Sequence, residues 1–207
     1  MVASKTPARE RNRIRIVDAA LALWMQRPEA SMDDVAVAAG VVRRTLYSHF
    51  DSREELIVAV ARCAAEFIDA PTDAADPEPD PAARLAQLST RLWQFGHHMR
   101  LMIGAASQAD PDAIAAIRGR ITAAVAAIVA EGQKTGQFSK RLPPQVIAAL
   151  LESAAVVLHE AATTTRGKIG QRDVAINALV VAGVDEADAV DVVRRHVSPR
   201  DLVITPE

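Results

Sequence analysis

The side chains best suited to chemistry gather between residues 41 and 50, where the sequence reads VVRRTLYSHF and includes the chain's only tyrosine. An exposed arginine carries a planar fork of donors that can bind O6 and N7 of guanine together. A threonine can donate to a phosphate while its methyl group meets thymine, and tyrosine and histidine are natural phosphate ligands. The stretch therefore predicts contacts with nucleic acid through Arg43, Arg44, Thr45, Tyr47 and His49.

A helix over this stretch would divide its residues between an inner and an outer face. With successive residues about 100° apart, Val42, Leu46 and Phe50 fall within about 80° of each other, and we expect them in the core. Arg44 and Ser48 point the opposite way, and the other polar residues lie on the flanks. An ordinary helical hairpin with a solvated face would show the same pattern, so both interpretations stay open at this point.

Earlier residues predict how this helix is positioned. Residues 9–26 carry apolar residues at +3, +4, +3 spacing, which predicts an amphipathic first helix. The spacing of Ser31 and Asp34 resembles a capping box and predicts the start of a short second helix, which we expect Gly40 to end. Two short helices joined by a glycine turn have the form of a helix-turn-helix. The residues expected on the buried face of the first helix are Ile14, Val17, Leu21 and Trp24.

Residues 16–60, IVDAALALWMQRPEASMDDVAVAAGVVRRTLYSHFDSREELIVAV, resemble the N-terminal DNA-binding region of the TetR family of transcriptional regulators. The parts that carry the resemblance are DAALALW, SMDDVA, AAGV and above all TLYSHFDSREEL. Val42 departs from the family pattern, which has a serine or similar cap there, so the helix that follows lacks a side-chain cap worth ~1 kcal/mol.

The resemblance implies roles for particular residues. It implies that Arg43, Arg44 and Thr45 read bases in the major groove. It implies that the phosphates are held by Ser31, Tyr47, His49 and Arg53. It also implies a homodimer on a palindromic double-stranded DNA operator, paired through helices expected at 144–162 and 171–182, with a small-molecule effector bound in the C-terminal part.

The composition predicts an all-α protein, because alanine is abundant and aromatic residues are 3% of the 207 residues. The spacing of apolar residues along the chain predicts about nine to ten helices. An N-terminal three-helix helix-turn-helix domain with a connecting fourth helix is expected over residues 8–68. A helical effector-binding and dimerisation domain is expected over residues 82–207. Between them, residues 69–81 contain four prolines and five acidic residues, which predicts an exposed linker.

Charge is unevenly distributed along the chain. Residues 1–50 carry a net charge of +3, and the remaining residues carry −5. The basic N-terminal residues would suit an arm lying near phosphates, although a solvated terminus would have the same composition. One cysteine cannot form an internal disulfide, and no uninterrupted apolar run approaches the ~20 residues of a membrane span. These features predict a soluble cytoplasmic protein.

A second apolar and aromatic face is the best candidate for an effector pocket. Trp93, His97 and Leu101 lie at i, i+4 and i+8, apart from the main leucine stripe, and His159 interrupts an otherwise apolar helix. These residues could line a cavity for a largely hydrophobic ligand or pack against neighbouring helices. No metal or other cofactor is predicted, because the neighbouring His97 and His98 point about 100° apart on a helix.

An enzyme is not predicted. The sequence lacks a phosphate-binding glycine loop, a nucleophile elbow and a zinc signature. Two functions remain: a ligand-released repressor of the TetR type, and an effector-independent DNA-binding protein that organises chromosome or division sites. Release of specific DNA by a small molecule would separate them.

Overall fold

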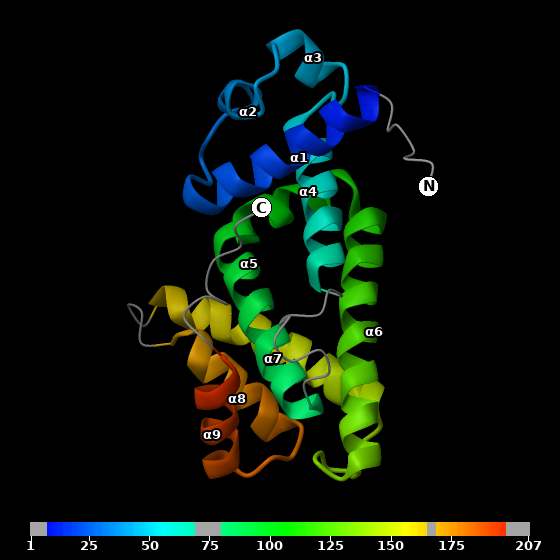
Figure 1. Cartoon of the computed structure of the whole chain (residues 1–207), viewed down its shortest axis with the longest axis vertical. Coiled ribbons are helices and arrows are strands. Elements are labelled where there is room, and N and C mark those ends of the chain that lie inside the picture. Colours follow the sequence, from blue (N-terminus) through cyan, green and yellow to red (C-terminus); the bar gives the residue numbers. More distant parts are fainter. Residues whose placement is uncertain (1–7, 69–79, 165–168, 198–207) are drawn as a thin grey trace, which may run out of the picture. The chain divides into compact units, whose positions relative to one another are not determined.

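The computed structural model describes residues 8–68, 80–164 and 169–197, without the side chains of residues 64–68, 97–102, 105, 109, 163 and 164. Within these residues the chain forms nine α-helices and no strand, as expected from the composition (Figure 1). The helices are α1 (Ala8–Gln26), α2 (Met32–Ala38), α3 (Arg43–Tyr47), α4 (Arg53–Ile68), α5 (Pro81–Ala109), α6 (Pro111–Thr135), α7 (Pro144–Thr164), α8 (Gln171–Val181) and α9 (Glu186–His196).

The described chain divides into two compact units. The first contains the described residues up to 64 together with 98–115, and the second contains 65–97 and the described residues from 116 onward. Helices α4, α5 and α6 each contribute to both units. The domain boundaries at 8–68 and 82–207 stay a prediction. Most of the predicted linker lies outside the described residues, and its last residue, Pro81, is instead the first residue of α5.

Helix α1 buries one face in the first unit, but that face is rotated from the expected one. Ile14 was expected in the core and is 47% exposed, whereas Ile16 is fully buried. The buried stripe is centred near Trp24 and Ala20, and Ile14 lies just outside it, about 20° beyond Leu21. The stripe consists of Ile16, Val17, Ala20, Leu21 and Trp24.

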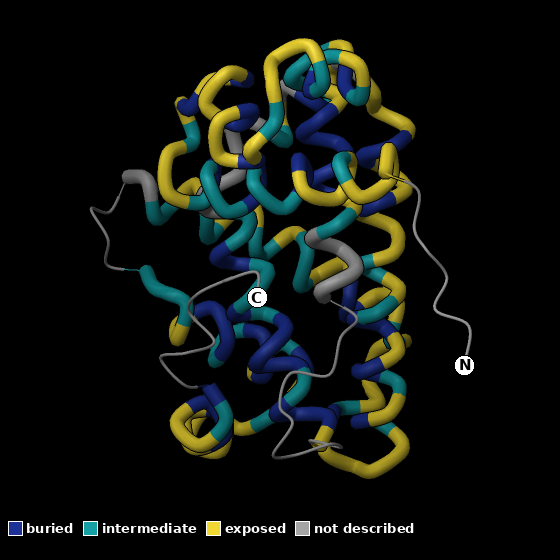
Figure 2. The backbone as a smooth tube through the Cα atoms, turned by 45° about the horizontal axis from the view of Figure 1, so that its top comes forward, coloured by how far each residue is buried: buried dark blue, intermediate teal, exposed yellow. Residues whose placement is uncertain are grey.

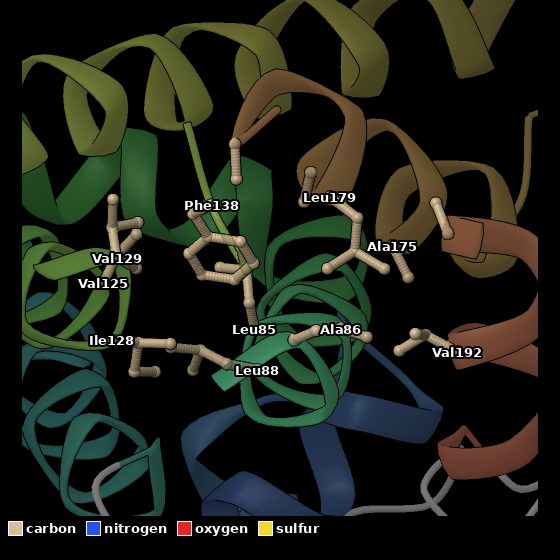
Figure 3. Close-up of a cluster of buried hydrophobic side chains, with 14 of the residues drawn as sticks. Leu85, Ala86, Leu88, Val125, Ile128, Val129, Phe138, Ala175, Leu179 and Val192 are labelled. Carbon is tan, nitrogen blue, oxygen red and sulfur yellow. The ribbon is translucent and has the colours of Figure 1, made fainter. Parts of the chain in front are cut away.

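The core of the second unit is formed by residues of five helices and one aromatic ring. Phe138, in the segment after α6, is 3% exposed and lies with Val125 and Val129 on one side and Leu179 on the other (Figure 3). Leu85 of α5 completes this group. Helix α8 packs against both α7 and α9. Burying these apolar side chains, at roughly 25 cal/mol per Å² of apolar surface, provides the main stabilisation of the unit.

Three polar side chains of α5 are also buried in the second unit. Gln87 donates through Nε2 to the carbonyl oxygen of His196 at 3.1 Å, at the end of α9. Gln94 donates to Oε1 of Gln171 at 3.0 Å, at the start of α8. Thr90 donates to its own helix, to the carbonyl of Ala86. The two glutamines therefore tie α5 to the ends of α8 and α9 through directional contacts.

Helix α7 combines a buried face with an exposed apolar face. Ile147 and Ala148 are buried in the core, and the other residues of α7 with described side chains are half-buried or exposed. Figure 2 shows the three burial classes along the described backbone. Val146, Leu150 and Val157 are 42%, 46% and 62% exposed, and their +4, +7 spacing places them on one face.

Two of the described helices have the length and apolar composition of membrane-crossing helices. They are α6 and the Pro144–Ala162 part of α7. Length and composition are weak evidence by themselves, because core helices of soluble proteins pass the same test. Here both helices contribute to the core of the second unit, through Val125 and Val129 of α6 and Ile147 of α7.

The packing around Phe138 predicts opposite effects for two alanine substitutions in α6. A Cβ atom at Gly132 would overlap the Phe138 ring, so Gly132→Ala should reduce the free energy of unfolding by about 1–3 kcal/mol. Gly119 is exposed in the same helix with no atom within 4 Å of an added Cβ. Gly119→Ala should therefore raise that free energy by up to about 1 kcal/mol through helix propensity. Urea unfolding measures both, and equal changes would contradict the packing.

Candidate nucleic-acid interface

Helices α2 and α3 are joined by a turn that requires glycine. Gly40 has φ 62°, and its N–H donates to the carbonyl of Val37 at 3.0 Å. Nη2 of Arg15 in α1 donates to the carbonyl of Ala39 at 2.7 Å and lies 3.0 Å from where a Cβ of residue 40 would be. Both the left-handed backbone and the arginine therefore favour glycine, and Arg15 fastens the turn to α1.

Val42 is not in the core, contrary to the helical-phase prediction. It is 70% exposed, with φ −78° and ψ 151°, and it precedes α3 as its N-cap. Because its backbone is extended, the 100° spacing of a helix does not apply to it. The expected lack of a side-chain cap is confirmed, since the Val42 side chain makes no capping hydrogen bond.

The inner side of this segment is formed by Leu46 of α3 and by Phe50, three residues after the end of the helix, which are 0% and 1% exposed. The guanidinium carbon of Arg13 in α1 lies 5.2 Å from the centre of the Phe50 ring. Here one of the basic N-terminal residues packs on the helix-turn-helix, where a cation over an aromatic face is a favourable contact. These contacts fix which side of α3 is exposed.

The outer side of α3 presents the predicted contact residues in two different states. Arg44 is exposed and has no polar partner among the described residues. Arg43 is also exposed, but its Nη1 forms a hydrogen-bonded ion pair with Oδ2 of Asp33 in α2. The guanidinium of Arg43 also lies 5.2 Å from the centre of the Tyr47 ring. Thr45, Tyr47 and His49 are half-buried.

The predicted capping box at the start of α2 is present. The N–H of Asp34 donates to Oγ of Ser31 at 3.2 Å, and the carboxylate of Asp34 accepts from Oγ and N of Ser31 at 2.7 and 2.8 Å. These hydrogen bonds hold the pKa of Asp34 below its usual range, and the bond from the Ser31 hydroxyl has the largest effect, followed by the bond from the Ser31 backbone N–H. The box fixes Ser31 at a helix N-terminus, where backbone N–H groups favour an anion.

Arg53 connects the start of α4 to the turn between α1 and α2. Its Nη1 donates to the carbonyl of Ala30, and its Nη2 donates to the carbonyl of Pro28 at 2.8 Å. Its guanidinium carbon lies 4.8 Å from the centre of the Trp24 ring. The indole Nε1 of Trp24 donates to the same Ala30 carbonyl at 3.0 Å. Arg53 therefore holds the residue that precedes Ser31, besides its predicted role with phosphate.

In the second unit, two of the predicted effector residues come together. The rings of Trp93 and His159 lie 4.0 Å apart between centres, tilted by 32°. The carbonyl oxygens of Ala155 and Trp93 are 2.7 and 3.1 Å from Nδ1 and Nε2 of His159. An added Cβ at Gly96 would be 3.0 Å from Nε2, so the imidazole packs closely on α5. The side chains of His97 and Leu101 lie outside the described residues.

Sequence reasoning missed three contacts of the helix-turn-helix. They are the ion pair of Asp33 with Arg43, the hydrogen bond from Arg15 to Ala39 and the shared Ala30 carbonyl. A buried tryptophan usually needs an acceptor for its N–H, and this signal could have indicated the Trp24 contact. Asp33 and Arg15 gave no such signal, because a charged residue on a helix is usually solvated.

The capping box predicts a pH-dependent contribution to stability. Because the pKa of Asp34 is lowered in the folded state, the ionised box stabilises the fold above about pH 4, and this contribution is lost as the pH falls through the folded pKa. Asp34→Asn should therefore lower the melting temperature near pH 6, and the difference from wild type should close toward pH 2. Asp51→Asn, which removes another exposed carboxylate of the same unit, is the control. A pH-independent difference for Asp34→Asn would contradict the assignment.

The sequence has recognisable relatives over its first third. A family model described as bacterial regulatory proteins of the tetR family matches residues 16–60. The HTH-type transcriptional repressor LfrR of Mycolicibacterium smegmatis is 39% identical over 74 residues, which cover 36% of this chain and 39% of LfrR. The uncharacterized HTH-type transcriptional regulator Rv1255c of Mycobacterium tuberculosis is 55% identical over 47 residues, covering 22% of this chain and 23% of that protein.

The fold has solved relatives over most of its length. The structure of RolR in complex with resorcinol superposes with a TM-score of 0.60, covering 90% of this chain and 95% of RolR at 20% identity. The similarity in fold thus extends well beyond the segment that the family model matches. The helix-turn-helix of residues 16–60 therefore matches the TetR family of bacterial regulatory proteins, and most of the chain shares its fold with RolR.

Proposed function

We propose that the protein is a transcriptional repressor that binds a palindromic DNA operator as a homodimer and is released by a small, largely hydrophobic ligand. The observation that carries DNA binding is the outer side of α3. Arg44 is exposed there without a polar partner among the described residues, while Leu46 on the opposite side is fully buried. A helix anchored on one side with a guanidinium on the other suits the major groove.

The proposed residue roles follow from side-chain type and exposure. Arg43, Arg44 and Thr45 contact base edges. Ser31, Tyr47, His49 and Arg53 hold phosphates. A guanidinium has five N–H donors, and Arg53 gives two of them to carbonyl oxygens, so three are left for a phosphate oxygen. Ser31 adds the N-terminus of α2, where unpaired backbone N–H groups attract an anion.

Repression, rather than another use of bound DNA, is supported by the relative LfrR, which is described as a transcriptional repressor. A dimer seated on an operator would block promoter access without any catalytic group. A repressor of this kind is not an enzyme, and it acts in the cytoplasm, where bacterial DNA is found.

The proposed dimer forms through α7 and α8. Val146, Leu150 and Val157 form an exposed apolar row on α7, and Val180 of α8 is 42% exposed. Exposed apolar rows of this kind mark protein interfaces in otherwise soluble proteins. A two-fold symmetric dimer would present two copies of α3, which matches the two halves of a palindromic operator.

The proposed effector site includes Trp93, His97, Leu101 and His159. Trp93 and His159 offer two stacked rings, which suit a largely hydrophobic ligand with an aromatic or flat face. The related RolR has been crystallised with resorcinol, a small aromatic molecule. Ligand-dependent release would couple this site to DNA binding as a difference in affinity between two states.

The residue roles predict two kinds of loss in DNA binding. After selection of bound sites from random DNA, Arg44→Ala should cost about 1–3 kcal/mol on the selected operator and relax discrimination at one base pair. Arg53→Ala should weaken binding to operator and random DNA alike and reduce the salt slope by ~0.9. Fluorescence anisotropy over a range of salt concentrations measures both.

Arg62→Ala removes an exposed arginine from α4 with no proposed DNA contact, and it should leave both affinities unchanged. Circular dichroism checks that Arg53→Ala remains folded, because Arg53 also holds the α1–α2 turn. Equal losses on operator and random DNA for Arg44→Ala would reject its role as a base reader. Selected sites that no small molecule releases would support instead the effector-independent organiser of chromosome or division sites.

The dimer surface predicts a change of assembly state. Val157→Asp places a charge in the exposed row of α7 and should convert the protein to monomer at micromolar concentration, with at least a tenfold loss of operator affinity. Val190→Asp changes a valine of α9 that is 44% exposed and lies outside the proposed surface, so it should stay dimeric. Sedimentation velocity measures both, and a monomeric wild type would reject the dimer.

A further inference from the structure

Three side chains on two helices form a charged cluster at the proposed reading surface. Asp33 of α2 and Arg43 of α3 form a hydrogen-bonded ion pair, although ten residues separate them in the sequence. The guanidinium of Arg43 lies over the Tyr47 ring at 5.2 Å. The side chains of Arg43 and Asp33 are 66% and 54% exposed, so the pair stands at the surface and is accessible to DNA.

The neighbouring Arg44 has the same chemistry but different surroundings. It follows Arg43 on the same short helix, is exposed, and has no polar partner among the described residues. The guanidinium of Arg43 is therefore held by a carboxylate and a ring, and that of Arg44 has neither contact among the described residues. The carboxylate of Asp33 therefore engages only one of the two arginines in the protein without DNA.

We propose that Asp33 is a positioning residue that sets DNA specificity by withholding Arg43 from phosphates on non-specific DNA. This inference rests on the proposed DNA binding. Non-specific affinity depends on how many phosphates a protein neutralises, and each one contributes about 0.9 to the salt slope. While the Arg43 guanidinium is bound to the Asp33 carboxylate, the pair is neutral and adds nothing to that number. Base reading by the two arginines then contributes a larger share of the total affinity.

A purely structural role for Asp33 would give a different result. Asp33 is one of two acidic residues in the first turn of α2, where a negative charge stabilises the helix N-terminus. If this were its whole role, Asp33→Asn would lower stability slightly and leave the salt dependence of DNA binding unchanged. The capping hydrogen bonds come from Asp34 and Ser31, so Asp33→Asn leaves the capping box intact.

The test compares four proteins on a random-sequence duplex and on the selected operator: wild type, Asp33→Asn, Arg43→Ala and the double variant. Asp33→Asn frees Arg43, so its salt slope on random DNA should steepen by ~0.9, and its affinity at about 0.1 M salt should rise roughly 5- to 10-fold. Affinity for the operator should rise less, so the ratio of specific to non-specific affinity falls. Arg43→Ala should leave the slope on random DNA as in wild type.

The double variant shows whether Asp33 acts by holding Arg43 or only by repelling phosphates with its negative charge. If Asp33 acts through Arg43, Asp33→Asn changes the slope only while Arg43 is present, and the double variant has the slope of Arg43→Ala. If Asp33 merely repels phosphates, the double variant is steeper than Arg43→Ala, and the inference is overturned. Asp33→Glu keeps a carboxylate within reach of Arg43, so this variant should have the same salt slope as wild type.

Glu54→Gln is the matched control, because Glu54 is an acidic residue in the first turn of α4 and has no ion pair among the described residues. It removes the same charge from the same kind of position and should leave the slope unchanged. Equal slopes for Asp33→Asn and wild type would overturn the inference while leaving DNA binding intact. A wild type that binds neither duplex would overturn the proposed function and this inference together.

Discussion

The carbonyl oxygen of Ala30 accepts two hydrogen bonds, and the geometry of the helix-turn-helix depends on them. One comes from the indole of Trp24 in α1 and the other from the guanidinium of Arg53 in α4. Ala30 immediately precedes Ser31, the N-cap of α2. This one carbonyl oxygen therefore links α1, α2 and α4. Ala30 is only 5% exposed, so water competes little for these hydrogen bonds. A shift of this turn would move the α2 N-terminus and, through the Gly40 turn, α3.

Several arginines of this framework are engaged by other groups of the protein. Asp33 neutralises Arg43, and Arg15 and Arg53 are engaged with backbone carbonyls. The basic excess of the first 50 residues therefore does not translate into an equal number of free cations, because several arginines act as structural donors. A guanidinium suits this use, since it stays charged and has donors in several directions. Few free cations at the reading surface favour selectivity over sheer affinity.

Local features of the fold were predictable from the sequence, and contacts between distant segments were not. The capping box of Ser31 and Asp34 and the glycine stop at residue 40 depend on neighbours three or four residues away, so their patterns are visible in the sequence. The position of Val42 was predicted wrongly because a helical wheel assumes helical backbone, whereas residue 42 is extended. The partners of Arg53 lie 23 and 25 residues earlier, and no spacing rule connects them.

Helix α7 has to meet three demands at once, and these explain its unusual composition. Its Ile147 and Ala148 fill the core of the second unit, and its His159 packs on Trp93 of α5. The remaining row, with Val146 and Val157, is apolar although it is exposed. A helix with a single buried face would have filled that row with charged residues, because nothing is gained by exposing valine to water. An apolar composition on both sides therefore indicates a second surface to be buried, and it also gives α7 the hydropathy of a membrane-crossing helix.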